Sequence, residues 1–307
     1  MSGPVREWDA RDCRDVLGEV EVREGRPAEV GGMGIVRVLP TKRRRTVGAW
    51  CFTDLMLPGD ELEPDPMEVG PHPHIGLATV TWLLDGEAVH TDSLGTEQAI
   101  RPGQLNLMTA GHGIAHAELG APEPLRGVQL WIAQPEETRH GANAFEHHAE
   151  LPQFEVAGAT GSVLLGTLAG ATSTARADTP LVGAQVSLRP GQTMLPIDPG
   201  FEHAVVPLDN RVKVGEDVVE HGWLAAVPPG PDALPLEAND VGATVLLLGG
   251  MPMDDPVVMW WNFVARDRDE ITAAWRDWQA HDDDRFGPVP SGLERIDAPA
   301  PPWVRSD

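Results

Sequence analysis

The chain of 307 residues lacks the features that mark several common classes of protein. Tyrosine is absent, and the only cysteines are Cys13 and Cys51, so the sequence implies no disulfide framework and fits a reducing compartment. No apolar run reaches the roughly 18 residues of a transmembrane helix, and no apolar stretch near the N-terminus has the form of a signal peptide. We therefore expect a cytoplasmic protein without a membrane span. Gly-x-Ser-x-Gly and phosphate-binding glycine loops are also missing, so serine hydrolases and nucleotide-dependent enzymes gain no support.

Basic residues are scarce relative to acidic ones. The chain has 23 Lys and Arg against 47 Asp and Glu, which gives a formal net charge of −24. Such an acidic chain repels phosphate backbones, so we expect no direct binding to nucleic acid. The one basic run, Lys42–Arg45, is open to interpretation as a nucleic-acid patch, but we favour a solvated loop between two apolar segments.

Short apolar or alternating segments, separated by glycine and proline, fill most of the chain. There are 33 Gly and 29 Pro, and Pro-Gly pairs typical of chain reversals recur at 58–59, 102–103, 190–191 and 199–200. Many short strands joined by tight turns predict an all-β sandwich or barrel. The expected strands are residues 34–39, 47–55, 77–84, 105–108 and 128–133, and then 162–168, 183–188, 203–208, 223–227 and 243–249.

The two halves of the chain share this rhythm of strands. Ile100–Gln104 and Leu188–Gln192 differ only in their first residue, a short echo that favours two related β domains. Between the halves, residues 168–179 are rich in Ala, Thr, Gly and Ser, and we expect them to form an exposed connection.

One helix is expected, at Asp267–Ala280, because apolar residues recur there at helical spacing. Asp267 or Asp269 can cap its start. The polar, proline-rich tail that follows forms either a strap or a loose end. Half of the ten tryptophans lie in this part of the chain, where we expect them to anchor packing: Trp260, Trp261, Trp275, Trp278 and Trp303.

Two alternating pairs of candidate metal ligands are the most informative feature. His72 and His74 form one pair, and His116 and Glu118 form the other. Residues two apart in a strand point to the same face, so each pair can project together. Three neutral imidazoles and a carboxylate suit Fe(II), Mn, Ni, Cu or Zn. A metal that accepts five or six ligands keeps a position open, which indicates a catalytic site rather than a closed zinc site.

Other histidines receive different interpretations. His112 is flanked by glycines, so we expect it in a turn and not as a ligand, whereas His90 and Asp92 are expected in a hairpin that supports the ligands. His147 and His148 lie in a polar stretch and are expected at the surface. His203 is the only histidine in a strand-like part of the second half. One histidine cannot build a matching site, so we expect the second domain to be metal-free.

Several of these segments together resemble one known family. The resemblance is strongest in His72–Gly86, His90–Gly95 and Met108–Glu118, and it continues through Gly127–Ile132. A weaker trace runs from Asp269 to Gly287. On these motifs the chain is similar to the pirin family, within the cupin superfamily.

The resemblance implies an all-β bicupin: two tandem cupin-type β-barrels with a short C-terminal helix. An N-terminal metal-binding cupin would span 20–150, a metal-free C-terminal cupin 160–290, and a tail 291–307. One divalent metal ion, with Fe(II) expected first and Mn, Ni, Cu or Zn as alternatives, would be held by the family's ligand positions. Those positions correspond here to His72, His74, His116 and Glu118.

The resemblance also implies a function. Several pirins resemble quercetin 2,3-dioxygenase in activity, which predicts an oxygenase acting on a flavonol-like substrate with dioxygen, and Glu118 as its catalytic base. The first alternative is a non-catalytic regulator whose acidic surface docks a transcription factor or a metabolic enzyme. A small-molecule-binding cupin is the second.

The chain departs from the family pattern at two positions. Pirins commonly carry Arg and Glu where this sequence has Ile75 and Ala78. We therefore expect a more apolar pocket that lacks one acid–base group.

Overall fold

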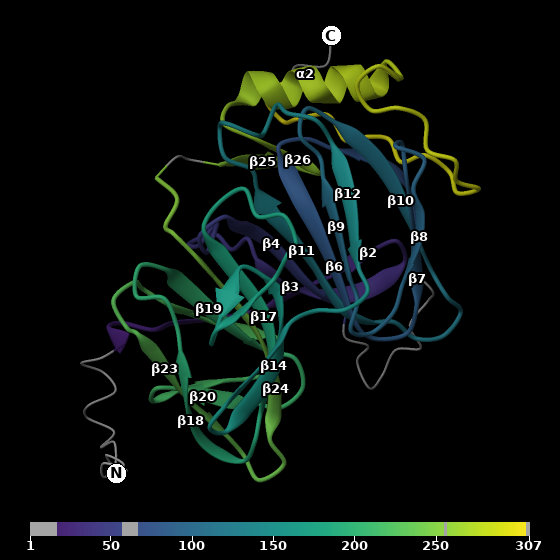
Figure 1. Cartoon of the computed structure of the whole chain (residues 1–307). Coiled ribbons are helices and arrows are strands. Elements are labelled where there is room, and N and C mark those ends of the chain that lie inside the picture. Colours follow the sequence, from purple (N-terminus) through teal and green to yellow (C-terminus); the bar gives the residue numbers. More distant parts are fainter. Residues whose placement is uncertain (1–16, 57–66, 255–256, 305–307) are drawn as a thin grey trace. The chain divides into compact units, whose positions relative to one another are not determined.

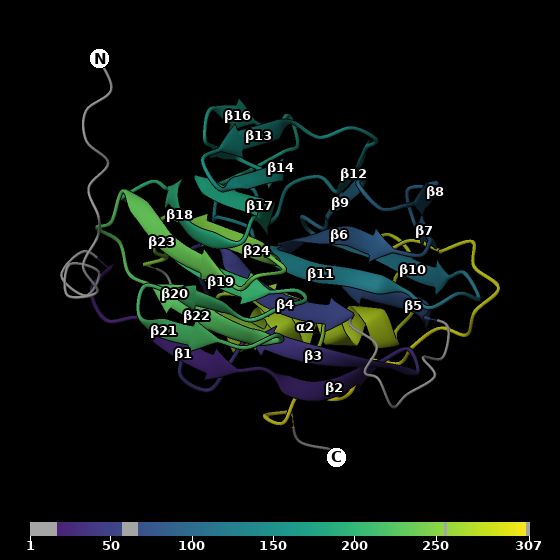
Figure 2. The ribbon, with the colours of Figure 1, turned by 90° about the horizontal axis from the view of Figure 1, so that it is seen from below.

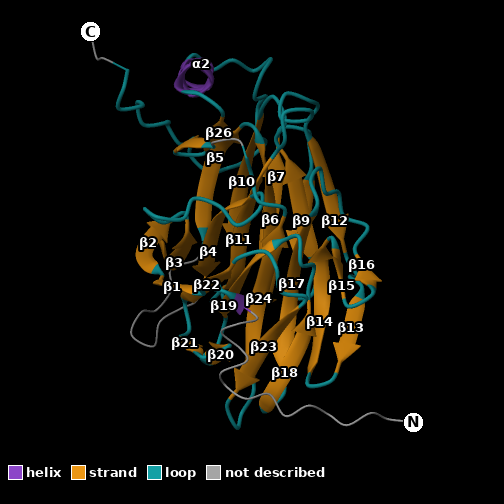
Figure 3. Cartoon of the chain, turned by 90° about the vertical axis from the view of Figure 1, so that its left-hand side faces the viewer, coloured by secondary structure: helices purple, strands orange, loops and turns teal. Residues whose placement is uncertain are grey.

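A computed structural model describes residues 17–56, 67–254 and 257–304 of the chain. These residues form two compact units, each of which contains segments from separate parts of the sequence. The first β unit comprises the described residues of 26–151, 175–179 and 253–304, and the second β unit comprises residues 17–25, 152–174 and 180–252. Strands dominate both units, and the one helix described over its full length is α2 (Arg268–Gln279), as Figures 1 and 3 show. The expected all-β class with a short C-terminal helix is confirmed.

The first β unit contains one large sheet, one small sheet and a hairpin. The large sheet runs, in spatial order, through β12 (Ala144–His148), β9 (Leu105–Thr109), β6 (Leu77–Asp85), β11 (Arg126–Ala133), β4 (Trp50–Met56), β3 (Met33–Leu39) and β2 (Arg26–Val30). The small sheet runs through β5 (Glu68–His74), β10 (Ile114–Gly120), β7 (Ala88–Asp92) and β8 (Glu97–Ile100). The hairpin pairs β25 (Val258–Trp260) with β26 (Phe263–Ala265).

The predicted strands of the first half match observed strands of this unit. One of them begins late: the expected strand at 47–55 starts only at Trp50. Gly48 has φ of +51°, and the backbones of Val47 and Trp50 exchange two hydrogen bonds of 2.9 and 3.0 Å, so residues 47–50 form a tight turn. The basic run Lys42–Arg45 lies in the largely exposed loop between β3 and β4, as expected.

Helix α2 packs on the first β unit, so the compact units do not coincide with the predicted domains of 20–150 and 160–290, whose boundaries stay a prediction. Its helical limits agree with the sequence, and Asp267 caps it by accepting hydrogen bonds from the backbone N–H groups of Asp269 and Glu270, both at 2.9 Å. The buried face of the helix joins a cluster that includes Ile75 of the first unit. Because burying apolar surface stabilises the fold, the β25–β26 hairpin, α2 and the tail pack together on the first unit and not on the second unit, which precedes them in sequence. Figure 1 shows α2 beside β25 and β26.

The tail after α2 is a strap rather than a loose end, as far as Val304. The Ile296 N–H donates to the Pro71 carbonyl on β5 at 2.9 Å. The indole N–H groups of Trp275 and Trp278 donate to the carbonyls of Ala298 and Ile296 at 3.1 and 2.9 Å. All five C-terminal tryptophans belong to or pack against one apolar cluster, so their expected anchoring role is confirmed.

The second β unit repeats the arrangement of one large and one small sheet. Figure 2 shows the neighbouring strands β17, β24, β19 and β22 of its large sheet. That sheet runs through β1 (Glu21–Glu24), β22 (Trp223–Val227), β19 (Glu202–Pro207), β24 (Ala243–Gly250), β17 (Leu181–Leu188), β14 (Ala159–Leu165) and β13 (Gln153–Val156). The small sheet runs through β18 (Gly191–Pro196), β23 (Ala233–Ala238), β20 (Val212–Val214) and β21 (Asp217–Val219). A short hairpin of β15 (Thr167–Leu168) and β16 (Ala171–Thr172) overlaps the start of the expected connection at 168–179, where Leu168 is buried.

The structure describes one of the two cysteines, and it bears on the expected absence of a membrane span. Cys51 is a buried free thiol whose pKa burial raises to about 12, and Cys13 lies outside the described residues. No helix in the described part of the chain has the length and apolar composition that a membrane crossing requires.

A buried histidine interrupts the aliphatic core of the second β unit. His203 on β19 is 1% exposed, and neither of its ring nitrogens has a hydrogen-bond partner among the described residues. Burial lowers its pKa from 6.5 to about 4, against the opposing attraction of Asp198. Gly249 on β24 leaves space for the ring, since a Cβ there would lie 2.6 Å from the His203 Cδ2. The imidazole is therefore held neutral inside the barrel.

Replacing this histidine should stabilise the protein most at acidic pH. The unfolded state binds a proton near pH 6.5 and the folded state only near pH 4, so His203 lowers stability as pH falls through this window. Between pH 8 and pH 5 we expect the parent to lose about 2 kcal/mol relative to His203→Leu. Urea denaturation at both pH values measures the difference, with His221→Leu, an exposed histidine of the same unit, as the control. An equal gain at both pH values would contradict this account.

Candidate metal centre

The register of three strands in the first β unit places its candidate ligands on one face. In the pairing of β5 with β10, His72 lies opposite His116. In the pairing of β10 with β7, His116 lies opposite Asp92 and Glu118 lies opposite His90. Directly opposite residues of antiparallel strands share a face, so these side chains point together into the barrel.

An irregularity in β5 helps to orient the first histidine. The register between β5 and β10 shifts between His116 and Glu118, where β5 carries Gly70 and Pro71. Proline has no N–H for the ladder, so it is tolerated at such irregular positions. The displaced Gly70 carbonyl accepts a hydrogen bond of 2.8 Å from His72 Nδ1. Gly70 also allows the tail to approach, since a Cβ there would lie 1.8 Å from the Glu294 carbonyl oxygen.

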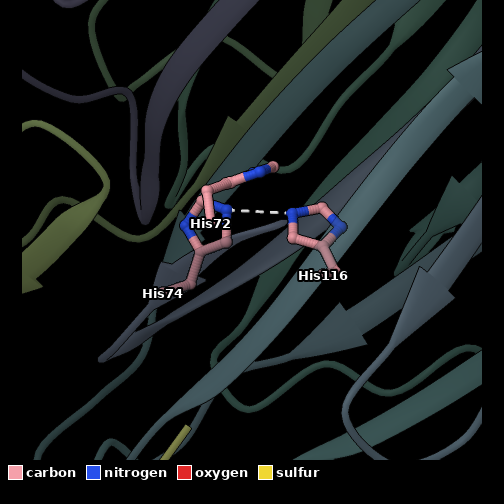
Figure 4. A group of neighbouring side chains, drawn as sticks. All are labelled: His72, His74 and His116. Carbon is pink, nitrogen blue, oxygen red and sulfur yellow. Dashed lines mark hydrogen bonds between the residues drawn. The ribbon is translucent and has the colours of Figure 1, made fainter. Parts of the chain in front are cut away.

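Three histidines converge at one point, as Figure 4 shows. One ring nitrogen from each of His72, His74 and His116 lies within 4.8 Å of the others, and all three side chains are buried. A carbonyl oxygen can only accept, so the Nδ1 of His72 must donate to Gly70, and the Nδ1 of His74 must donate to the Asn262 carbonyl at 3.0 Å. The Nε2 atoms of these two rings therefore carry free lone pairs.

Burial keeps these imidazoles neutral. It lowers the pKa of His72 to about 4, and it lowers the pKa values of His74 and His116 well below 6.5. Repulsion between the neighbouring rings acts in the same direction. Neutral imidazole is the form that binds metal ions.

The spacing of the ring nitrogens fits a shared metal ion. The Nε2 atoms of His74 and His116 are 3.0 Å apart. Two nitrogens bound at roughly 2.1 Å to one ion are about this far apart when their bonds meet near a right angle. The donor set and its geometry therefore match an imidazole-rich site for a divalent first-row metal.

Glu118 lies beside this cluster rather than inside it. Its carboxylate forms a second candidate group with His90 and His116, and it accepts a hydrogen bond of 3.3 Å from the Thr81 hydroxyl. Burial raises its pKa above the ordinary value for glutamate. The three histidines thus come together as expected, while ligation by Glu118, and with it the four-ligand set, stays a prediction. Both candidate groups found among the described residues belong to the first β unit.

A cavity of about 350 Å³ leads to the histidines. Its wall is mostly apolar and includes Val30, Met33, Ile35, Met56, Met67 and Val69. Phe52 and Trp131 stack on one side with ring centroids 3.9 Å apart, and Trp131 meets His74 edge-on at 5.2 Å. Two stacked aromatic rings therefore line the cavity beside the cluster.

One ion pair interrupts this apolar lining. Arg37 binds Asp54 through two hydrogen bonds of 2.6 Å, and its guanidinium lies 4.4 Å from the centre of the Phe52 ring. Burial raises the pKa of Asp54, although Arg37 acts against this shift. The bidentate pair holds the stacked rings in place from the cavity side.

The C-terminal segment supplies part of the site, which the sequence did not indicate. Trp261, Asn262 and Ile296 line the cavity, and Asn262 also orients His74. No residue pattern points to Asn262, because it acts through a backbone carbonyl that every residue has. Only the packing of the segment onto the first unit reveals it.

The remaining histidines fall into two groups. His112 is exposed in a turn, as expected, and His90 lies behind His116 in the barrel. The expectation of surface positions for His147 and His148 is wrong, because both lie half-buried in β12. There they bind Asn106 and Glu146 at 2.7 and 3.0 Å.

The expected effect of Ile75 and Ala78 on the pocket is also wrong. Neither residue lines the cavity. Ile75 follows His74 and points to the opposite face of the chain, where it packs in the cluster that contains α2. On β6, the side chain of Ala78 points to the face opposite to that of Thr79 and Thr81. Thr81 lies on the face that contains Glu118. The departure from the family pattern therefore leaves the cavity wall untouched.

Comparisons with known proteins agree with this architecture. The family profile described as Pirin matches residues 32–132, and the profile of the Pirin C-terminal cupin domain matches residues 183–286. The second profile includes α2, although α2 packs on the first unit.

Individual relatives match most of the chain. A Pseudomonas aeruginosa protein named "Putative quercetin 2,3-dioxygenase" is 45% identical over 96% of this chain and 95% of its own length. A Caulobacter vibrioides protein named "Pirin-like protein" is 37% identical over 84% of this chain and 92% of its own. The crystal structure of a quercetin 2,3-dioxygenase from Acinetobacter baumannii matches with a TM-score of 0.87 and 38% identity, covering 96% of this chain and 99% of that one. The expected bicupin fold is confirmed.

Breaking the cavity ion pair from one side should cost more than removing both partners. Asp54→Leu leaves the Arg37 guanidinium without its anion, and we expect a loss of about 2 kcal/mol because Arg37 is only partly exposed. Arg37→Met combined with Asp54→Leu should recover part of that loss. Denaturant unfolding of the parent, the single variants and the double variant measures the coupling. A double variant whose loss is the sum of the two single losses would rule out the pair as a coupled unit.

Proposed function

The chain belongs to the pirin family, and on that premise we propose that it is a metal-dependent oxygenase of the quercetin 2,3-dioxygenase type. One divalent ion, Fe(II) in the first place, is held by His72, His74 and His116, with Glu118 as the fourth ligand. The observation that carries the proposal is the convergence of three buried, neutral imidazoles at the end of an apolar cavity. The names of the relatives support the class of reaction.

A divalent ion held by these residues would supply Lewis-acid chemistry for the substrate and dioxygen. Imidazole and carboxylate donors suit Fe(II), and they also suit Mn, Ni, Cu and Zn, so the preference for iron is part of the proposal. The three imidazoles would hold the ion at the end of the cavity, where a substrate could reach it.

Glu118 is the proposed proton acceptor. Its carboxylate is buried, lines the cavity and has a pKa raised by burial, so it can accept a proton near neutral pH more readily than an exposed glutamate. Thr81 holds one of its oxygens from the side of β6. As a ligand that can swing away from the metal, Glu118 would take the proton from a substrate hydroxyl.

The cavity fits a planar, largely apolar substrate. Phe52 and Trp131 offer aromatic surface, and Met33, Met56 and Met67 offer polarizable surface that adapts to a ring system. A flavonol-like substrate has this shape.

Oxygen uptake with quercetin tests the proposal. Protein reconstituted with Fe(II) under anaerobic conditions should bind one iron and consume oxygen when quercetin is added. His72→Ala should lose both iron and uptake, because it removes a ligand. Glu118→Gln should keep iron but lose uptake by about 10²- to 10⁴-fold, the range of general-base contributions. His112→Ala, an exposed turn position, is the matched control and should behave like the parent.

Two results would contradict parts of the proposal. Full uptake by Glu118→Gln would remove the proton-accepting role from this residue. Iron bound by the parent at one equivalent, without uptake on any flavonol, would reject the oxygenase and favour the regulatory or ligand-binding alternatives. Salt-sensitive binding to a purified protein partner would then select the regulator.

A further inference from the structure

His116 differs from the other two clustered histidines in what its Nδ1 faces. His72 and His74 donate from Nδ1 to backbone carbonyls, which fixes their tautomers. The Nδ1 of His116 instead faces the Nδ1 of His90 at 3.3 Å. An imidazole nitrogen can donate or accept, so this contact alone leaves the tautomer of His116 open.

The contact of Asp92 with His90 resolves which tautomer His116 adopts. Its Oδ1 accepts hydrogen bonds from the backbone N–H groups of Leu94 and Thr96, at 2.9 and 3.0 Å. These bonds leave Oδ2 facing His90 Nε2 at 3.0 Å. Asp92 is fully buried, and an ionised carboxylate only accepts, so His90 must donate to it from Nε2.

We propose that Asp92 and His90 set the tautomer of His116 and thereby aim its Nε2 lone pair at the metal position. With its proton on Nε2, His90 presents a lone pair on Nδ1. His116 must then donate from Nδ1, which leaves its Nε2 free beside the Nε2 of His74. Asp92 and His90 are positioning residues for a ligand they support, and the inference rests on the proposed metal site.

The alternative tautomer would close the site. If His116 carried its proton on Nε2, that N–H would donate to the free Nε2 of His74, 3.0 Å away. The two rings would then be hydrogen-bonded to each other, and only the Nε2 lone pair of His72 would remain free to bind a metal. The direction of the His90–Asp92 and His116–His90 hydrogen bonds therefore decides whether the Nε2 of His116 is free to bind a metal or donates to His74.

Asp92→Asn is the variant that reverses this direction without changing shape. The turn at residues 94 and 96 still needs an oxygen to accept its two N–H groups, so the amide must place its NH₂ toward His90. That NH₂ donates to His90 Nε2, which moves the His90 proton to Nδ1. His90 then donates to His116 Nδ1, and His116 is left with its proton on Nε2.

His90→Asn provides the second variant and the control. Asparagine is smaller than histidine, cannot reach both neighbours, and can turn its carbonyl toward His116 Nδ1. It therefore disconnects His116 from Asp92 while still accepting a hydrogen bond. Adding Asp92→Asn to this variant should have no further effect on the metal site.

Binding of Ni²⁺ measured by titration calorimetry gives the first readout, since imidazole ligands suit this ion and it is stable in air. We expect Asp92→Asn to weaken Ni²⁺ binding by about 10- to 100-fold. The single His90→Asn variant and the double variant should share one smaller loss. A double variant weaker than His90→Asn would overturn the proposal, because Asp92 would then act through the turn and not through His90. Parent-like affinity in Asp92→Asn would overturn it as well.

Long-range ¹H–¹⁵N spectra of histidine-labelled, metal-free protein give the second readout. The parent should carry its His116 proton on Nδ1, and Asp92→Asn should carry it on Nε2. A parent with the proton on Nε2 would overturn the proposal. Because this readout needs no metal, a parent with the expected tautomer that binds no Ni²⁺ would reject the metal site while upholding the role of Asp92 and His90.

Discussion

The hydrogen bonds behind three buried imidazoles are the constraint on which this molecule's site depends. Burial makes the rings neutral, and a neutral imidazole presents its lone pair on whichever nitrogen lacks the proton. His72 and His74 are each held by a backbone carbonyl, and His116 faces another imidazole. Without an acceptor for each Nδ1 proton, the same three imidazoles could hydrogen-bond to one another. Fewer ring nitrogens would then have a lone pair free to bind a metal.

Several parts of the surrounding structure place those acceptors. The irregular stretch of β5 turns the Gly70 carbonyl toward His72. The Asn262 carbonyl comes from the loop of the β25–β26 hairpin, which the chain reaches only after completing the second β unit. Helix α2 and the tryptophan-anchored tail fix that hairpin through apolar burial. The C-terminal segment thus acts as a structural part of the first unit and as a wall of its cavity.

Strand alternation and helical spacing were enough to predict the element types and the main cluster. His72 and His74 lie on one strand, His116 and Glu118 on another, and the helix capped by Asp267 has the expected limits. The unpredicted parts depend on long-range packing. Asn262 contributes only its backbone carbonyl, for which side-chain type carries no signal. The C-terminal segment packs on the first unit although the second unit precedes it in sequence. The outward orientation of Ile75, by contrast, follows from strand alternation after His74.

Anomalous diffraction from crystals of the full chain loaded with one equivalent of Ni²⁺ tests the central claim most directly. The account predicts one anomalous peak in the first β unit, within about 2.2 Å of the Nε2 atoms of His72, His74 and His116. The lone pairs of all three rings would then meet on one ion. A peak bound through His116 Nδ1, or a metal held at a different site while the three histidines stay hydrogen-bonded to one another, would contradict it.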